Sequence, residues 1–407
     1  MKYYKCPYCL RSFRRKTARS TINDNGYQTY YCPYAQIAGG EKACGSQLPN
    51  GFFKGRSKVI AIVGGVNVGK TVYIVALLRQ LLKNDNLAGM DISGDLVGKK
   101  EDKQYFYDRI AEYEKGEPFE PTKRFFEAHK KALVFDVAIK NTFGRGFKHI
   151  YLSFFDTPGE GLSSMQYMQK EMACLYRADG LILLIEPLQI KHLRKSIILQ
   201  HKYVEDQRPE DLKGLLNRII SLMLDAQENT LSPKAMEAIR QARFSMAGNR
   251  QRPEEDERNN VPAGRIRRQA RIISSPWNWL VSKLSSNGTV KCPVAIGITK
   301  IDQMRHLLSH DIPFDHEDFK RKYVRHGLFN TRLIYKISKD LRKIILENRE
   351  GGEGFKKQLE QIREYEFFGI KSGDVDENGD IVNISTPQGV FLPLIWILIT
   401  LKLYKNG

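Results

Sequence analysis

The chain has 407 residues, 42% of them hydrophobic and 27% charged, which is ordinary for a soluble globular protein of two or three domains. The N-terminus lacks a signal-peptide pattern, and the most apolar run, 390–401, is shorter than the roughly 20 residues that span a bilayer, so we expect a cytoplasmic protein without a transmembrane segment. The formal net charge of +19 favours polyanionic partners without identifying one, and a solvated basic surface explains it equally well.

Residues 1–53 form a cysteine-rich segment. Cys6 and Cys9 make a Cys-x-x-Cys knuckle, and Cys32 and Cys44 supply two more thiolates. Four thiolates complete the tetrahedral set of a structural Zn²⁺ ion, so we predict a small zinc ribbon. The competing interpretation is redox chemistry, because Cys-Pro-Tyr-Cys is also the glutaredoxin tetrapeptide. That chemistry needs a thioredoxin-type sheet, for which too little chain precedes residue 57.

The same segment is basic and aromatic. Basic and aromatic residues on a zinc ribbon bind nucleic acid in some proteins, but they also pack small metal-centred cores or dock partner proteins. All three interpretations stay open at the level of sequence. The basic residues are Lys2, Lys5, Arg11, Arg14, Arg15, Lys16, Arg19 and Lys42, against Asp24 and Glu41.

Residues 54–188 alternate apolar β-like runs with helical patterns, which predicts a mostly parallel sheet with helices on both faces. A strand at 58–65 leads into a helix from residue 71, and the turn between them fits G-x-x-x-x-G-K-[ST]. Its amide groups and the helix N-terminus are suited to phosphate oxygens. We expect the lysine to reach the β- and γ-phosphates and the threonine to ligate Mg²⁺. The cradle consists of Gly64, Gly65, Val66, Asn67, Val68, Gly69, Lys70 and Thr71.

Two further apolar segments, 132–141 and 148–156, are predicted to be paired strands. Asp156 ends the second one and is expected to hold Mg²⁺ through a water. Gly159 follows three residues later and can offer its amide to the γ-phosphate. Glu160 stands where a water-orienting residue is expected, although a carboxylate beside a triphosphate is repelled.

Residues 189–289 are polar, basic and helix-prone, and they are predicted to be a helical insertion in the α/β domain. Within it, 249–271 is dense in charge and poor in large apolar residues. We expect a flexible surface loop there, with a nucleic-acid-binding arm as the less favoured alternative.

Residues 290–407 return to the α/β pattern, and the apolar run 292–298 ends in Thr299, Lys300, Ile301 and Asp302. A carboxylate at this place can accept hydrogen bonds from both N1–H and N2–H₂ of guanine, a donor pair that adenine lacks. The aliphatic part of Lys300 can cover the purine face. The order of the three motifs therefore favours a guanine nucleotide, GTP or GDP.

Together, GGVNVGKT, DTPG and TKID resemble the motifs of P-loop GTPases of the Ras and translation-factor class. FEPTKR, ADGLILLIEPLQ and STPQGVFLPLIWIL are most similar to the bacterial double-GTPase family, which implies a role in bacterial conflict or stress systems. The resemblance implies the three-layer P-loop NTPase fold. It also implies Thr122 as a switch threonine on Mg²⁺, although a helix N-cap suits it equally. Ser372 becomes a guanine-supporting residue, without the usual Ser-Ala pair.

These motifs predict a Mg²⁺-dependent guanine-nucleotide switch with slow GTP hydrolysis that a partner or self-association raises. An effector protein and nucleic acid are the candidate partners. The alternatives are a nucleotide-gated scaffold with little turnover and an ATPase of the same fold.

Overall fold

The computed structural model describes a little under three fifths of the chain. It covers residues 2–22, 24, 26–34, 44–65, 68–82, 92–98, 100–115, 133–140, 147–156, 173–190, 192–194, 197, 212–229, 289–308, 324–325, 328–329, 331–346, 352–372, 374–375, 381–383 and 387–404.

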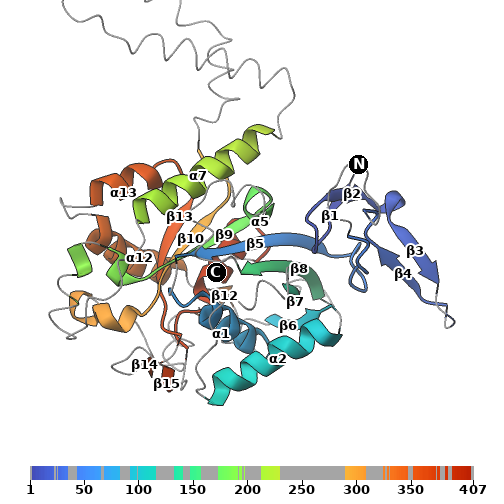
Figure 1. Cartoon of the computed structure of the whole chain (residues 1–407), viewed down its shortest axis with the longest axis horizontal. Helices are drawn as coiled ribbons and strands as arrows, with labels where there is room; N and C mark the ends of the chain where they lie inside the picture. Colours follow the sequence, from blue (N-terminus) through green and yellow to red (C-terminus); the bar gives the residue numbers. More distant parts are fainter. Residues whose placement is uncertain are drawn as a thin grey trace, which may run out of the picture.

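The N-terminal segment, called the head below, consists of two small antiparallel sheets (Figure 1). The first pairs β1 (Tyr3–Lys5) with β2 (Ser12–Arg14), and the second pairs β3 (Arg19–Ile22) with β4 (Gln28–Tyr31). The single 3-10 turn η1 (Arg15–Thr17) joins them.

A seven-stranded sheet forms the body, in the order β13-β10-β9-β5-β8-β7-β6. The five strands from β13 to β8 are parallel, β7 runs antiparallel to β8, and β6 runs antiparallel to β7. This arrangement confirms the predicted mostly parallel α/β sheet. The bounds are β5 (Arg56–Gly64), β6 (Ile92–Val97), β7 (Leu133–Lys140), β8 (Phe147–Asp156), β9 (Gly180–Ile185), β10 (Val294–Ile298) and β13 (Tyr365–Gly369).

Helices cover the sheet and bury its central strands completely (Figure 1). Helix α1 contacts β5, β6 and β8, α12 lies on β13, and α14 packs against β9 and β10. The helices are α1 (Lys70–Leu82), α2 (Lys100–Lys115), α5 (Ala173–Tyr176), α7 (Leu212–Asn229), α12 (Thr331–Leu346), α13 (Gly352–Leu359) and α14 (Leu392–Thr400). Shorter elements are η4 (Pro187–Gln189), η6 (Ile301–Leu307), β11 (Val324–Arg325), β12 (Leu328–Phe329), β14 (Asp374–Val375) and β15 (Ile381–Asn383).

The apolar C-terminal run forms α14, whose side chains from Leu392 to Leu398 are buried, as predicted for a core helix. Within the described part of the chain, no helix combines the length and the apolar character that crossing a membrane requires.

The described part of segment 189–289 packs into the body. Helix α7 contacts α5 and α13, and its Leu215, Leu216 and Ile219 belong to the main hydrophobic core. The predicted loop 249–271 lies outside the described residues.

The head shares a hydrophobic cluster with the sheet. Phe52 and Phe53 pack with Val134 of β7 and Tyr151 of β8, and the Tyr151 hydroxyl donates to the carbonyl of Asn50 at 2.8 Å. The cluster also takes in Cys6, Phe13, Cys32 and Leu48. The cysteine-rich segment therefore has an apolar core that the body completes.

Candidate functional site

The glycine-rich turn lies at the carboxyl end of the central strand β5 and leads directly into α1. Gly64 needs its lack of a side chain, because a Cβ there would stand 2.7 Å from the carbonyl oxygen of Leu184 and 2.7 Å from Cγ2 of Val68. Gly69 has a φ of +77°, in the left-handed region that glycine adopts without strain. The turn can therefore bring its main chain close to a ligand on its inner side. Val66 and Asn67 lie outside the described residues.

Lys70 is buried at the first turn of α1, with 6% of its surface exposed. Its Nζ donates to the carbonyl oxygens of Gly64 at 2.9 Å and Gly65 at 2.6 Å, so the side chain folds back over the turn. A buried ammonium group beside the positive end of a helix favours a neighbouring anion. Thr71 follows in the same helical turn and is partly exposed. These features fit a bound phosphate chain.

Asp156 is the last residue of β8, and the strand register sets it opposite Ile62, two residues before Gly64. Its main chain is therefore beside the glycine-rich turn. Three other predicted residues, Thr122, Gly159 and Glu160, lie outside the described part of the chain.

The predicted base-recognition motif begins where β10 ends. Thr299 is buried, and its amide donates to the carbonyl of Ile185 at 2.9 Å, which ties the motif to the end of β9. Lys300 has a φ of +48°, an unusual conformation for a residue with a side chain. Asp302 stands in the first turn of η6 and is partly exposed.

Glu186 is a residue of this site that the motifs do not single out. It directly follows β9, is 9% exposed, and accepts a hydrogen bond from Nζ of Lys300 at 2.7 Å. Gln189 caps it by accepting from its amide at 3.1 Å. The only sequence signal is a carboxylate at the end of a buried strand, IEP, the same signal that marks Asp156. Glu186 fixes the direction of the Lys300 side chain.

Ser372 follows β13, next to the β10 motif. Its carbonyl accepts a hydrogen bond from the hydroxyl of Tyr113 in α2, and the neighbouring Lys371 pairs through its main chain with Gln388. Burial raises the pKa of Tyr113, so its hydroxyl stays protonated as a donor. Helix α2 thus contacts the loop in which the sequence places base support.

The predicted motifs meet at one edge of the sheet. The register sets Ile62 of β5 beside Asp156, Gly64 beside Leu184, and Ile298 of β10 beside both Ile185 and Gly369. Strands β5 and β10 are separated by β9 alone, which corresponds to about 10 Å. The glycine-rich turn and the TKID motif therefore stand side by side with one strand between them.

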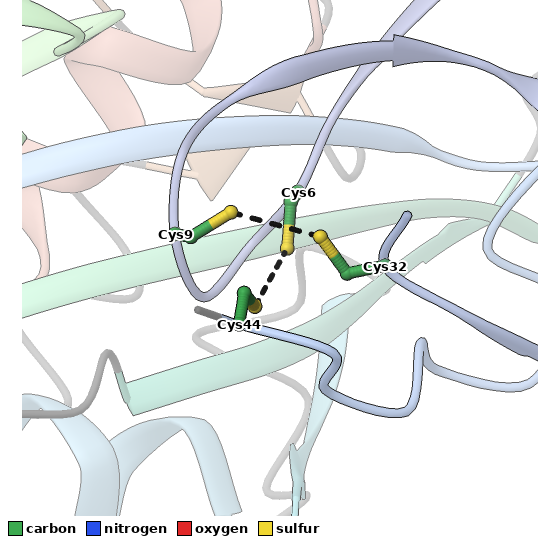
Figure 2. Close-up of side chains that lie close together, drawn as sticks. All are labelled: Cys6, Cys9, Cys32 and Cys44. Atoms are coloured by element: carbon green, nitrogen blue, oxygen red, sulfur yellow. Dashed lines mark hydrogen bonds between the residues drawn. The ribbon is translucent and has the colours of Figure 1, made fainter. Parts of the chain in front are cut away.

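The four cysteines of the head converge on one point (Figure 2). Their sulfur atoms all lie within 4.8 Å of one another, with Cys6 and Cys44 3.9 Å apart and Cys9 and Cys32 3.7 Å apart. A tetrahedral Zn²⁺ with bonds of about 2.3 Å places its sulfur ligands roughly 3.8 Å apart. The predicted cluster is confirmed, and its spacing fits a four-thiolate metal ion.

The structure disfavours the redox interpretation. The described part of the head has two separate two-stranded sheets instead of a thioredoxin-type sheet. Cys32 and Cys44 also lie with the Cys6–Cys9 pair, all four sulfur atoms being within 4.8 Å of one another.

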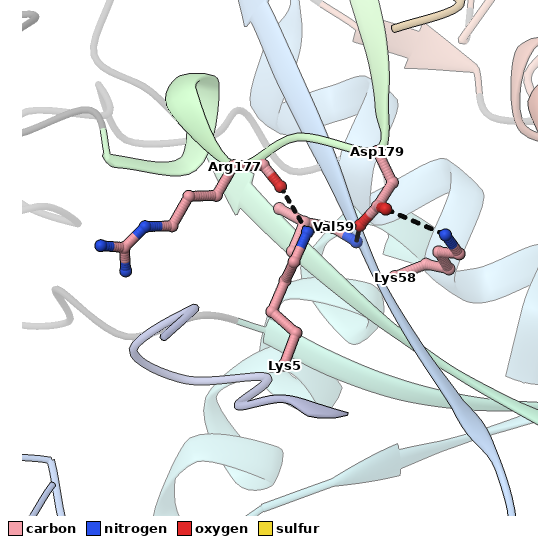
Figure 3. Close-up of polar contacts among 5 residues, drawn as sticks. All are labelled: Lys5, Lys58, Val59, Arg177 and Asp179. Atoms are coloured by element: carbon pink, nitrogen blue, oxygen red, sulfur yellow. Dashed lines mark hydrogen bonds and ion pairs between the residues drawn. The ribbon is translucent and has the colours of Figure 1, made fainter. Parts of the chain in front are cut away.

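A partly buried carboxylate joins the head to the body (Figure 3). Asp179, just before β9, accepts from Nζ of Lys5 at 2.9 Å, from Nζ of Lys58 at 2.9 Å and from the amide of Val59 at 3.0 Å. Burial opposes its charge, but the two ammonium groups outweigh this effect and lower its pKa. Arg177 completes the junction, because its carbonyl accepts from Lys5 at 2.8 Å and its guanidinium donates to the carbonyl of Cys9 at 3.0 Å.

Comparison with known proteins yields one family model. Residues 58–248, a little under half of the chain, match the model described as Double-GTPase 2. This match confirms the resemblance indicated by the motifs. No curated protein matches the chain.

Two solved structures are similar to the chain at low identity. One is the Methanosarcina barkeri Roco2 RocCORdC bound to GDP, with 10% identity, a TM-score of 0.23, and coverage of 84% of this chain and 49% of that one. The other is the S. cerevisiae Ski7 GTPase-like domain bound to GDP and inorganic phosphate, with 12% identity, a TM-score of 0.26, and coverage of 86% and 51%. The chain thus spans about half the length of the solved structures that it matches.

Proposed function

We propose that this chain, similar over residues 58–248 to Double-GTPase 2, is a guanine-nucleotide switch that binds GTP with Mg²⁺ and hydrolyses it slowly. One observation carries the proposal: the glycine-rich turn after β5 and the TKID motif after β10 share one edge of the sheet, with only β9 between them. Such an edge is where open parallel sheets bind nucleotides.

The assignment of roles follows the positions of the residues. The turn from Gly64 to Thr71 holds the triphosphate, with Lys70 against its β- and γ-phosphates. Asp302 accepts from the guanine ring, and Lys300, held by Glu186, covers the purine face. When bound, Mg²⁺ neutralises charge on the phosphate oxygens, and Thr71, Asp156 and Thr122 are the residues that we assign to it.

The proposed hydrolysis of GTP depends on residues around the γ-phosphate. Positioning and charge neutralisation supply most of the catalysis in phosphoryl transfer, and Lys70 provides part of both. Glu160 occupies the place of the water-orienting residue, and the repulsion between a carboxylate and a triphosphate makes intrinsic turnover slow. We infer that an effector protein or a second copy of the chain accelerates it.

The decisive experiment measures nucleotide affinity for the wild type, Lys70→Ala and Asp302→Asn. Removing Lys70 should weaken GTP binding by about 10- to 150-fold, the value of a hydrogen bond to a charged group. Asp302→Asn should lower affinity for GTP and raise it for xanthosine triphosphate, whose ring offers an acceptor where guanine offers its amino group. Lys339→Ala, an exposed lysine on α12, is the control.

Three outcomes separate the alternatives. Unchanged GTP affinity in Lys70→Ala removes the nucleotide proposal altogether. Equal competition by ATP and GTP points to an ATPase of the same fold. GTP binding without basal or partner-stimulated phosphate release points to a nucleotide-gated scaffold.

We also propose that the head holds a structural Zn²⁺ ion, on the strength of the spacing of its four sulfur atoms. Metal analysis should give about one zinc per chain, and Cys9→Ser should lose it. Cys292→Ser, which changes a thiol in the body, should retain it. A wild type without zinc, isolated under reducing conditions and without chelators, contradicts the assignment.

A further inference from the structure

The head carries a projecting β-ribbon whose base contacts the head's core through Tyr30 and whose outer part does not. Strands β3 and β4 form a two-stranded sheet that extends away from the body (Figure 1), and one bridge between Tyr31 and Gln47 joins its base to the rest of the head. All four residues of β3 are exposed. At the tip, Ile22 is 71% exposed and Tyr27 is 72% exposed. A lone two-stranded ribbon is marginally stable in water, so one that displays apolar side chains indicates a binding surface.

The structure divides the aromatic residues of the head into two groups. Tyr4, Phe13 and Tyr30 pack in or against the head's hydrophobic cluster. Tyr3, by contrast, is 57% exposed, and Tyr27 is 72% exposed. Core packing therefore explains only part of the aromatic content of the head.

Two consecutive arginines connect the ribbon to the first sheet. The guanidinium of Arg14 lies 5.1 Å from the ring centroid of Tyr3 in β1, and that of Arg15 lies 5.7 Å from the ring centroid of Tyr30 in β4. These contacts hold flat cationic groups in fixed orientations. Lys16 follows them in η1 and is fully on the exposed side of the head.

A chain of polar contacts continues across one face of the ribbon. Arg15 donates to the hydroxyl of Tyr30 at 3.3 Å, Tyr30 donates to Gln28 at 2.7 Å, and Gln28 donates to Ser20 at 3.2 Å. The register places Ser20 opposite Tyr30 and Ile22 opposite Gln28, so these four residues share a face. This face combines donors, acceptors and an apolar side chain within a strongly basic surface.

The charged residues of the head are almost all positive. Residues 2–22 contain seven lysines and arginines and no acidic residue, and Lys5 pairs with the carboxylate of Asp179. Asp24 is the single acidic residue among the described residues of the head. Such a surface selects a polyanion.

We propose that the β3–β4 ribbon and the adjoining Arg14–Arg15 pair bind single-stranded nucleic acid. Cations along a backbone path, with exposed rings on which bases stack, are the combination that single strands require. A duplex hides the faces of its bases, and the described part of the head lacks the amphipathic helix typical of a protein that lies on an anionic membrane. The proposal goes beyond nucleotide binding and does not depend on it.

The test uses the full chain with its zinc content checked, and a fluorescein-labelled 12-nucleotide oligouridylate as the probe for anisotropy titrations. The ribbon variant is Arg15→Ala with Lys16→Ala and Tyr27→Ser, all exposed positions. The control is Lys336→Ala with Lys339→Ala and Tyr335→Ser on α12, which removes the same charge and a tyrosine that is 51% exposed.

The ribbon variant should bind at least tenfold more weakly, since one stacked base alone contributes roughly 5- to 150-fold. The slope of log affinity against log salt should fall by about 1.4, the value for two lost phosphate contacts to a single strand. The control, and Lys70→Ala, should bind the probe like the wild type, which separates this surface from the nucleotide site.

Two results overturn the proposal. One is an equal loss of affinity in the ribbon variant and the control, because the binding would then follow net charge alone. The other is equal affinity of the wild type for the single strand and for a 12-base-pair duplex, because stacking on exposed rings would then play no part. Retained zinc in the ribbon variant shows that its head is folded.

Discussion

At the scale of single residues, the glycine-rich turn depends on one absent side chain. Gly64 lies against the main chain of β9, where a Cβ would approach the Leu184 carbonyl oxygen to 2.7 Å. A backbone atom in a central strand cannot move aside as a flexible side chain can. The position therefore tolerates glycine alone.

Gly64→Ala should destabilise the chain by about 1–3 kcal/mol, the usual cost of overpacking, and weaken nucleotide binding at the same time. The measurement is urea unfolding together with a nucleotide titration. Gly354→Ala in helix α13 is the matched control, because the atoms nearest to its added Cβ belong to the flexible side chain of Lys213 in α7, the closest at 3.4 Å. The control should be neutral or stabilising by up to about 1 kcal/mol. Equal effects at both positions would refute the steric argument.

The ion pair between Glu186 and Lys300 is a second contact between single residues that affects the site. Glu186→Gln removes the charge that holds Lys300, so binding of the guanine ring should weaken by about fivefold. Because this pair acts on the base and not on the phosphates, GTP and GDP should lose the same factor. Competition titrations with both nucleotides measure it. A loss confined to GTP would instead place Glu186 near the γ-phosphate.

At the scale of elements, sequence predicts well what local pattern determines. The buried strands β5, β9 and β10 and the helix α1 follow from apolar runs and from the glycine-rich turn. Strand β6 escapes such reasoning, because ISGDLV contains serine, glycine and aspartate and joins the sheet only through its pairing with β7.

Sequence likewise identifies some residues of the candidate site and misses others. The motifs name Lys70 and Asp302, since their spacing carries the chemistry. They do not name Glu186 or Asp179, because the partners of these carboxylates lie more than a hundred residues away in sequence, at Lys300 and Lys5. Contacts of that range depend on the folded sheet and leave no local pattern.

The junction between head and body makes stability depend on pH. The pKa of folded Asp179 is lower than that of an unfolded aspartate, about 3.9, so the junction stabilises the fold above that pH. This contribution is lost as the pH falls below about 4 and through the folded pKa. Asp179→Asn should therefore lose less stability than the wild type between pH 5 and pH 3.

Urea unfolding at each pH tests this prediction. Protons also displace zinc from thiolates, so variants are compared with one another at the same pH. Asp24→Asn, an exposed change in the head, should follow the wild-type profile. Identical profiles for Asp179→Asn and the wild type would show that the junction does not titrate in this range.

At the scale of the whole molecule, the proposed zinc site and two strands of the body share one hydrophobic cluster. The head's cluster contains Val134 and Tyr151 of the sheet, so the head cannot unfold without exposing them. Removing zinc from the nucleotide-free protein should lower the melting temperature by on the order of 5–10 °C. Calorimetry should still show one transition, and readdition of zinc should restore the original temperature. Two separate transitions would mean that the head and the body fold independently.

Strand β5 has the head at one end and the glycine-rich turn at the other, a distance of about 30 Å over its nine residues. Strand β5 therefore separates the proposed binding surface of the head from the proposed nucleotide site. We expect that the β3–β4 ribbon can be exchanged for another binding module, provided that Lys5 and the packing of Phe52 and Phe53 against Tyr151 are kept. A chimera of this type should bind a different partner and keep the nucleotide affinity of the wild type.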